Sequence, residues 1–153
     1  MKKLSILLSA LLLSATPVLA DDYLYLKCEE SIEANLRHAQ TSEFIKKEAM
    51  PNIVLIYKIA IKDQILKGIV LNERGSLKTY DVQIDDDRLT YSEDLGVGTG
   101  KSSFQLIMNL SPPFDLESKG RFISNEQPVI ITWKNQGVCK NVAASVFEKA
   151  INQ

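Results

Sequence analysis

The chain has 153 residues, with 18 lysines and arginines against 19 aspartates and glutamates. This length predicts a single domain that is large enough to bury a core. The nearly balanced charge, without a cluster of basic residues, argues against nucleic acid or an anionic membrane as the main partner, because both require a basic patch.

The first twenty residues predict a secretory signal peptide. Lys2 and Lys3 give a positive start, residues 4–13 are almost wholly apolar, and Ala20 ends a usable cleavage site. We expect cleavage after Ala20, which leaves a mature domain of residues 21–153. An uncleaved anchor is the alternative, although the apolar run is shorter than the roughly 20 residues of a membrane-spanning helix. The two-lysine start is typical of bacteria, so we expect a periplasmic or secreted protein without membrane contact after cleavage.

The chain contains two cysteines, Cys28 and Cys139. In an oxidising compartment an even number of cysteines indicates a disulfide bond. A zinc site would need more ligands than these two and His38, the single histidine. A disulfide would bring the two Cα atoms to within about 7 Å, so both ends of the mature chain would meet.

Alternation of apolar and polar residues dominates the mature chain and predicts about eight short strands. Turns are expected at residues 63–64, 72–75 and 85–86, and the glycines at 96, 98 and 100 predict a flexible loop. The prolines at 112 and 113 should end a strand. The predicted strands are residues 23–27, 53–61, 65–71, 77–84, 88–92, 104–110, 114–124 (interrupted around Gly120) and 129–134.

Two segments have helical spacing instead. Residues 31–49 carry Ile32 and Leu36 one helical turn apart, which predicts one helix or two short pieces. Residues 141–152 have a broad apolar stripe, with Asn141 as the expected N-cap.

These elements predict a mainly β fold, an antiparallel barrel or a strongly curled meander with a C-terminal helix packed across it. An open sheet leaves unpaired backbone groups at its edges. A disulfide between the first strand and the segment after the last strand would hold those edges side by side, which favours a barrel over a flat sandwich.

Three motifs suggest chemistry, and each has a simpler interpretation. Residues 96–102 end in the Gly-Lys-Ser of a phosphate-binding loop, but Leu95 stands where that loop needs glycine, so we predict a hairpin loop. The acids at 81, 85–87 and 93–94 could bind Ca²⁺ but lack the EF-hand spacing, and a solvated hairpin corner is favoured. Glu29 and Glu30 could mimic a glycosidase pair, yet adjacent strand residues point to opposite faces.

A hydrolase would depend on His38, which we expect to be an exposed helical residue. No nucleophile elbow surrounds any of the serines. The strand aromatics Tyr57, Tyr80, Phe104 and Trp133 are expected to pack in the core, because the interior of a small barrel is normally filled. The alternative is that they line a cavity for a small apolar ligand.

Short strings at the two ends of the mature chain resemble small uncharacterised secreted proteins of cyanobacteria. The strings are Tyr-Leu-Lys-Cys at 25–28, Thr-Trp-Lys at 132–134 and Gly-Val-Cys at 137–139. The resemblance implies a disulfide between the first and last strands and no particular activity.

The sequence therefore favours a secreted, non-enzymatic binding domain, without a cofactor or a metal, whose partner is either a small apolar molecule or another secreted protein. One alternative is a protein-binding inhibitor or adaptor that acts through the loops 95–101 and 111–121. The other is a hydrolase with an unrecognised site.

Overall fold

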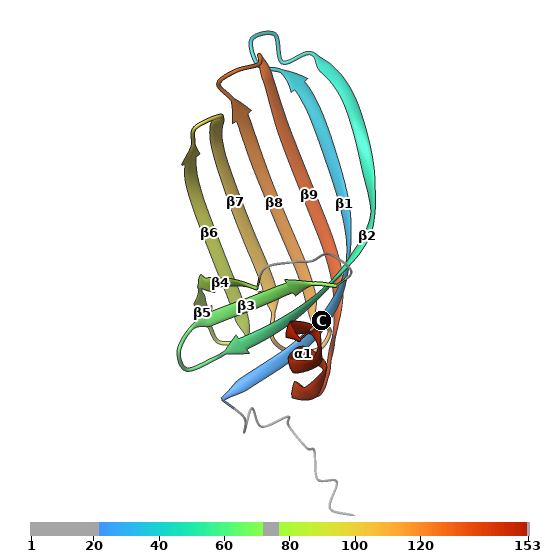
Figure 1. The fold of residues 1–153 in the computed structure, drawn as a ribbon, viewed down its shortest axis with the longest axis vertical. Coiled ribbons are helices and arrows are strands. Elements are labelled where there is room, and N and C mark those ends of the chain that lie inside the picture. The colour runs from blue at the N-terminus through green and yellow to red at the C-terminus, as the bar shows by residue number, and fades with distance from the viewer. Residues whose placement is uncertain (1–21, 72–76, 153) are drawn as a thin grey trace, which may run out of the picture.

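The computed structural model describes residues 22–71 and 77–152. The predicted signal peptide with its cleavage after Ala20, and the predicted turn at 72–75, lie outside the described residues. The described chain forms nine antiparallel strands and one helix (Figure 1). They are β1 (Tyr23–His38), β2 (Phe44–Ala60), β3 (Ile65–Val70), β4 (Lys78–Asp81), β5 (Gln83–Asp85), β6 (Arg88–Val97), β7 (Gly100–Asn109), β8 (Asp115–Ser124), β9 (Val129–Asn141) and α1 (Ala144–Ile151).

The strands form one sheet in the order β4-β3-β2-β1-β9-β8-β7-β6-β5. Its edge strands β4 and β5 are consecutive in the chain and separated only by Val82, so the two edges meet. The backbone N–H of Val82 donates to the carbonyl of Gln64 at 2.8 Å, and the rings of Tyr80 and Tyr91 lie 4.7 Å apart across the seam. The predicted fold class, a mainly β, barrel-like antiparallel sheet with a C-terminal helix, is confirmed as a nearly closed barrel.

The position of the seam differs from the sequence prediction. The first and last strands do not form the edges; they pair with each other in the middle of the sheet. The edges come from the middle of the chain, where the backbone turns at Val82. The reason is that hairpins extend outward from the β1–β9 pair on both sides until their outermost strands meet.

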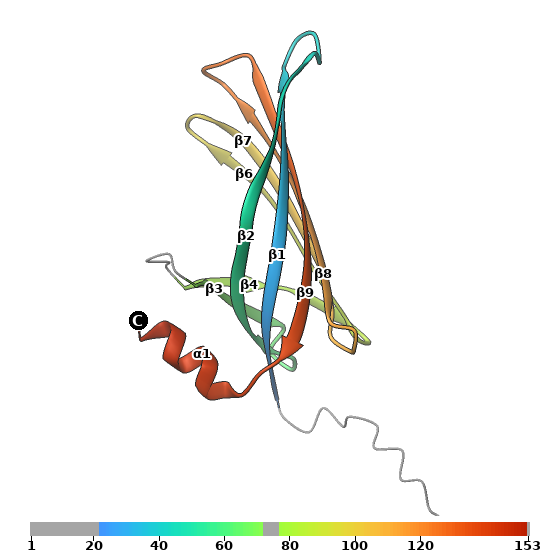
Figure 2. The same cartoon turned by 90° about the vertical axis from the view of Figure 1, so that its right-hand side faces the viewer.

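The barrel is closed at one end only. The short strand β3 pairs with residues 55–60 of β2, and β5 pairs with residues 88–90 of β6. The longer strands β1, β2 and β6–β9 continue beyond these short ones, and Figures 1 and 2 show them rising as a curved, open sheet. The inner face of the molecule therefore has a closed lower part and an open upper part.

Apolar side chains fill the closed end. Strand β1 alternates strictly there, with Leu24, Leu26 and Cys28 buried and the residues between them more exposed. They pack against Ile59 of β2 and Leu66 of β3, both fully buried. Full burial of each aliphatic side chain contributes about 1.5–3 kcal/mol of transfer free energy. This end of the barrel is the main hydrophobic core.

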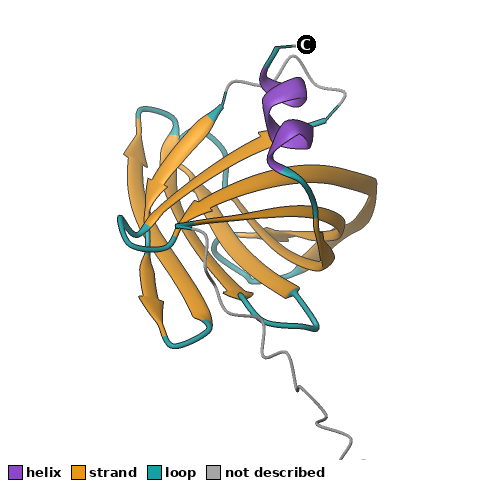
Figure 3. Cartoon of the chain, turned by 90° about the horizontal axis from the view of Figure 1, so that it is seen from below, coloured by secondary structure: helices purple, strands orange, loops and turns teal. Residues whose placement is uncertain are grey.

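Helix α1 covers the outer face of the closed end (Figure 3). Its Phe147 and Ala150 pack against Ile56 of β2 and Ile69 of β3 in a second, smaller core. The predicted helix began at residue 141, but Asn141 is the last residue of β9 and the residue before the helix provides no side-chain cap. The strand pairing extends this far because the N–H of Val142 still donates to a carbonyl of β1.

The predicted helix at 31–49 is wrong. Strand β1 continues to His38, a turn follows, and β2 begins at Phe44. Ile32 and Leu36 are four residues apart, which is one helical turn but also two full steps of a strand. Pairing with β9 decides between these structures, because residues 26–38 of β1 lie in continuous register with residues 129–141.

The observed strands also differ in their bounds from the predicted ones, and two differences concern interruptions. The predicted strand at 77–84 is divided at Val82 into β4 and β5. The predicted interruption at Gly120 is absent, and β8 runs unbroken through it. Gly120 is a close-approach position, because a Cβ atom there would lie 2.0 Å from the indole of Trp133.

Candidate functional site

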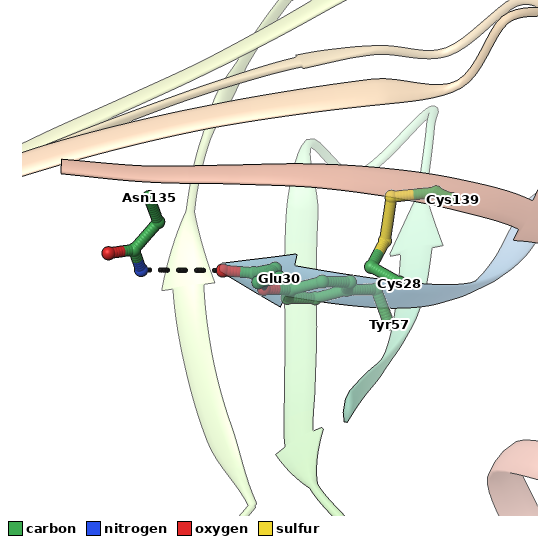
Figure 4. Close-up of a disulfide and its surroundings, with 5 residues drawn as sticks. All are labelled: Cys28, Glu30, Tyr57, Asn135 and Cys139. Carbon is green, nitrogen blue, oxygen red and sulfur yellow. Dashed lines mark hydrogen bonds between the residues drawn. A yellow bond between two sulfur atoms is a disulfide. The ribbon is translucent and has the colours of Figure 1, made fainter. Parts of the chain in front are cut away.

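The disulfide bond marks the boundary between the filled core and the open part of the inner face. Cys28 and Cys139 are direct partners in the β1–β9 ladder, and their Cα atoms are 4.0 Å apart. Both side chains lie in the main core. The predicted pairing of these cysteines is thus present in the structure (Figure 4). Toward the open end, the next pair of this ladder on the inner face is Glu30 and Gly137.

Glu30 is a buried acid on an otherwise apolar strand face. It follows Leu26 and Cys28 at strand spacing, so it points inward, and only 3% of its surface is exposed. Gly137 makes room for it, because a Cβ atom there would lie 2.8 Å from Cγ of Glu30. The neighbouring Glu29 is exposed, as expected for adjacent residues of a strand.

Two side chains donate hydrogen bonds to the Glu30 carboxyl group. The Tyr57 hydroxyl donates to Oε1 at 2.8 Å, and Nδ2 of Asn135 donates to Oε2 at 3.4 Å (Figure 4). Desolvation raises the pKa of Glu30 above its ordinary value, and these two hydrogen bonds offset part of that rise. Burial and the nearby Glu30 hold the pKa of Tyr57 well above 10, so its hydroxyl remains a donor.

Asn135 contributes an acceptor without a partner. The residue is 9% exposed, and within the described chain its Oδ1 is buried and forms no hydrogen bond. In Figure 4 this oxygen points away from Glu30, while Nδ2 points toward it. Buried polar atoms are normally satisfied, so this acceptor is available to a donor from water or from a ligand.

These polar groups line a partly open cavity of about 380 Å³ on the inner face. Its polar end consists of Glu30, Ser118 and Asn135, and Lys78 lies exposed at the rim. Its volume lies within the roughly 300–1,000 Å³ range of small-molecule sites, which are mostly apolar with a few convergent polar groups. The remaining lining residues are aliphatic or aromatic, apart from one glycine: Ile53, Leu55, Tyr57, Leu66, Gly68, Val70, Tyr80, Phe104 and Leu106.

The four aromatic residues singled out in the sequence were expected either to pack in the core or to line a ligand cavity, and the structure shows both arrangements. Tyr57, Tyr80 and Phe104 line the cavity, and Tyr57 also belongs to the main core. Trp133 does not line it, because its indole lies over the facing Gly120 of β8. The prediction that core packing accounts for all four is therefore only partly right.

The Gly-Lys-Ser segment forms a hairpin, as expected, but the predicted flexible loop is shorter. Strand pairing continues to Val97 and resumes at Gly100, so only Gly98 and Thr99 remain as the turn. A strand follows this turn, whereas a phosphate-binding loop opens a helix. The outer face beside it has a shallow hollow of about 320 Å³ lined in part by Asp94, Lys101 and Arg121, which is more open than the inner cavity.

The acidic segment forms the corner of the β5–β6 hairpin. Asp85 and Arg88 are backbone partners in the β5–β6 ladder. Asp86 takes the left-handed backbone conformation of a tight turn, with φ of 52°. Within residues 22–71 and 77–152, no three His, Cys, Asp or Glu side chains form a group able to hold a metal ion.

His38 was expected to be an exposed helical residue. It is instead the last residue of β1 and is half-buried. Its Nδ1 accepts a hydrogen bond from the N–H of Gln40 at 3.4 Å. Its hydrogen bonds to Ser42 and Glu43 join backbone atoms only. In the described part of the chain no hydrogen bond joins its imidazole to the side chain of a serine or an acid, so these residues do not assemble a catalytic triad around it.

No protein-family model and no curated protein matches the chain. The described residues contain no helix of the length and apolar character needed to cross a membrane.

Sequence reasoning considered Glu30 only as part of a glycosidase-like pair and missed Asn135 entirely. A usable signal was present in both strands. Glu30 continues the inward-facing alternation of β1 beyond Cys28, and Asn135 continues that of β9 beyond Gly137. Extending the first predicted strand by three residues would have placed an acid on the buried face. A buried acid on an apolar face requires partners.

Proposed function

We propose that this protein is a secreted binding domain that holds a small amphipathic molecule, mainly apolar, inside its half-open barrel. The observation that carries the proposal is the 380 Å³ cavity with an apolar wall and a few buried polar groups at one end. This is the composition of a small-molecule site. The intramolecular disulfide supports a function in an oxidising compartment such as the periplasm or the cell exterior.

The fold supports reversible uptake into a preformed site. The core and the disulfide cross-link the closed end, while the short strands β3–β5 leave the upper inner face uncovered. The apolar wall can accept a chain or a ring, and the polar end can orient one head group.

The alternative of a protein-binding inhibitor acting through loops has less support. The segment 95–101 is mostly paired strand with a two-residue turn, and residues 115–121 belong to β8. Neither segment provides the long exposed loop that this alternative needs.

Titration with N-phenylnaphthylamine, a neutral apolar dye whose emission rises in apolar sites, tests the proposal. The variant Ile53→Trp fills the cavity from its wall, and we expect it to weaken dye binding about tenfold or more, which corresponds to about 1.4 kcal/mol. The matched control is Val54→Trp, on the same strand but on the opposite face and also half-buried. It should bind the dye as the natural protein does.

If the natural protein does not bind the dye, or if Ile53→Trp and Val54→Trp change binding equally, the proposed function is wrong. Circular dichroism of both variants shows whether the sheet remains intact.

A further inference from the structure

We propose that the ligand of this cavity has a head group that donates hydrogen bonds, with a protonated amine preferred over a hydroxyl, and that this head group binds beside Glu30 and Asn135 at the polar end of the cavity. The inference rests on the proposed function and adds the chemical class of the ligand. It depends on two independent observations at the polar end of the cavity.

The first observation is a buried carboxyl group that forms no ion pair with any described residue. The ion pairs of the described residues are Lys46–Glu48, Lys47–Glu33 and Lys62–Asp22, all on exposed side chains, and none includes Glu30. An ionised carboxylate has about four lone-pair sites, and Tyr57 and Asn135 occupy two of them. The remaining sites can accept hydrogen bonds from a ligand.

The missing cation also fits the electrostatics of the site. Desolvation is the largest cause of the raised pKa of Glu30. A buried charge is normally compensated by an opposite charge, and an ammonium group with its three donors provides both the charge and the hydrogen bonds. A hydroxyl provides one hydrogen bond without the charge, so it should bind more weakly.

The second observation is the orphaned Oδ1 of Asn135. The amide nitrogen is directed to the carboxyl group of Glu30, which leaves the oxygen on the opposite side (Figure 4). Asn135 and Glu30 both line the cavity. A head group with two or more N–H or O–H donors can satisfy both acceptors, whereas a carboxylate or phosphate would be repelled by both.

Lys78 gives the opposing possibility. Among the described residues it is the only cationic one that lines the cavity, and it could hold an anionic head group at the rim. Its side chain is exposed, so water already solvates its charge and a surface pair there gains little. Glu30 and Asn135 lack that solvation, and for this reason we place the head group at the inner end.

The test compares four ligands with the same ten-carbon chain as competitors for N-phenylnaphthylamine at neutral pH. Decylamine should displace the dye best, decanol next, and decyl methyl ether and decanoate least, with about tenfold or more between decylamine and decanoate. In Glu30→Gln, which keeps the shape of the side chain, decylamine should lose its advantage over decanol. In Asn135→Leu both donor ligands should bind more weakly, while the ether should not.

The outcomes separate this inference from the proposed function. If decanoate binds best and Lys78→Gln weakens it, the head group lies at the rim, and the inference is wrong while the apolar site stands. If all four ligands bind equally, the inference is also wrong. If the natural protein binds neither dye nor ligands, both proposals fail. Should a variant not fold by circular dichroism, the ligand order in the natural protein still decides.

Discussion

Breaking the disulfide should destabilise the protein mainly through its unfolded chain. Cys28 and Cys139 are 111 positions apart and are direct partners in the β1–β9 ladder. Closing a loop of this length corresponds to about 4.8 kcal/mol at 25 °C in the chain-entropy model. The ladder continues on both sides of the cysteines, so we expect the native sheet to form without the bond.

Equilibrium urea unfolding of three forms measures this contribution. The oxidised protein and the protein reduced with a thiol reagent contain the same buried sulfur atoms, so their difference in unfolding free energy isolates the covalent link. The double variant Cys28→Ala, Cys139→Ala should lose more, because it also leaves cavities in the core. The m-value should be larger for the reduced protein, since its unfolded chain is free to expose more surface.

The expected loss is a large share of a typical domain stability of about 5–15 kcal/mol. Circular dichroism at low urea should show the same strand content with and without the bond. A difference below about 1 kcal/mol between oxidised and reduced protein would contradict the loop-entropy argument. Loss of the sheet on reduction would instead contradict the claim that strand pairing is independent of the bond.

Two further predictions concern the inner face. Gly120→Ala should lower the free energy of unfolding by about 1–3 kcal/mol and shift the emission of Trp133 to the red, because the new Cβ atom collides with the indole. The control is Gly96→Ala, where nothing lies within 4 Å of the added Cβ atom. It should change the free energy of unfolding by less than about 0.5 kcal/mol. A mild Gly120→Ala would show that the indole moves aside freely. The pKa of Glu30 is raised in the folded state, so the folded protein binds this proton more tightly than the unfolded chain does. The stability that the bound proton contributes is therefore complete below the ordinary pKa of 4.5. It is lost as the pH rises through the pKa of the folded state. The stability of Glu30→Gln relative to the natural protein should therefore increase with pH over that window in urea unfolding, and a flat or falling difference would contradict the raised pKa.

Local alternation was sufficient to predict the fold class, and the even number of cysteines behind a signal peptide was sufficient to predict the disulfide. Leu24, Leu26 and Cys28 share one parity in the sequence and one buried face in the structure. In most other strands, too, alternate residues in the sequence are apolar and share one face. It predicts which face is buried but does not determine how far a strand extends or which strands lie at the edges.

Long-range pairing determined what the sequence pattern could not. The segment 31–49 has spacings that satisfy both a helix and a strand, and its partner in β9 lies about a hundred residues further along the chain. The order of strands likewise depends on the seam at Val82, where no turn-forming residue marks the break. The polar end of the cavity was hidden for the same reason, because Glu30 and Asn135 are 105 positions apart.

One repeated device explains why this barrel has a cavity above its filled end. Three large inward side chains each face a glycine on the neighbouring strand: Tyr57 faces Gly68, Trp133 faces Gly120, and Glu30 faces Gly137. A Cβ atom at any of these glycines would lie within 3.0 Å of the large side chain. None of the described glycines has positive φ, so backbone freedom does not explain them. Each large side chain instead lies over the adjacent strand and does not project across the barrel, which leaves the centre hollow at the level of the buried acid. Alanine at Gly137 should therefore displace Glu30 and reduce ligand binding even though it adds no group to the cavity wall.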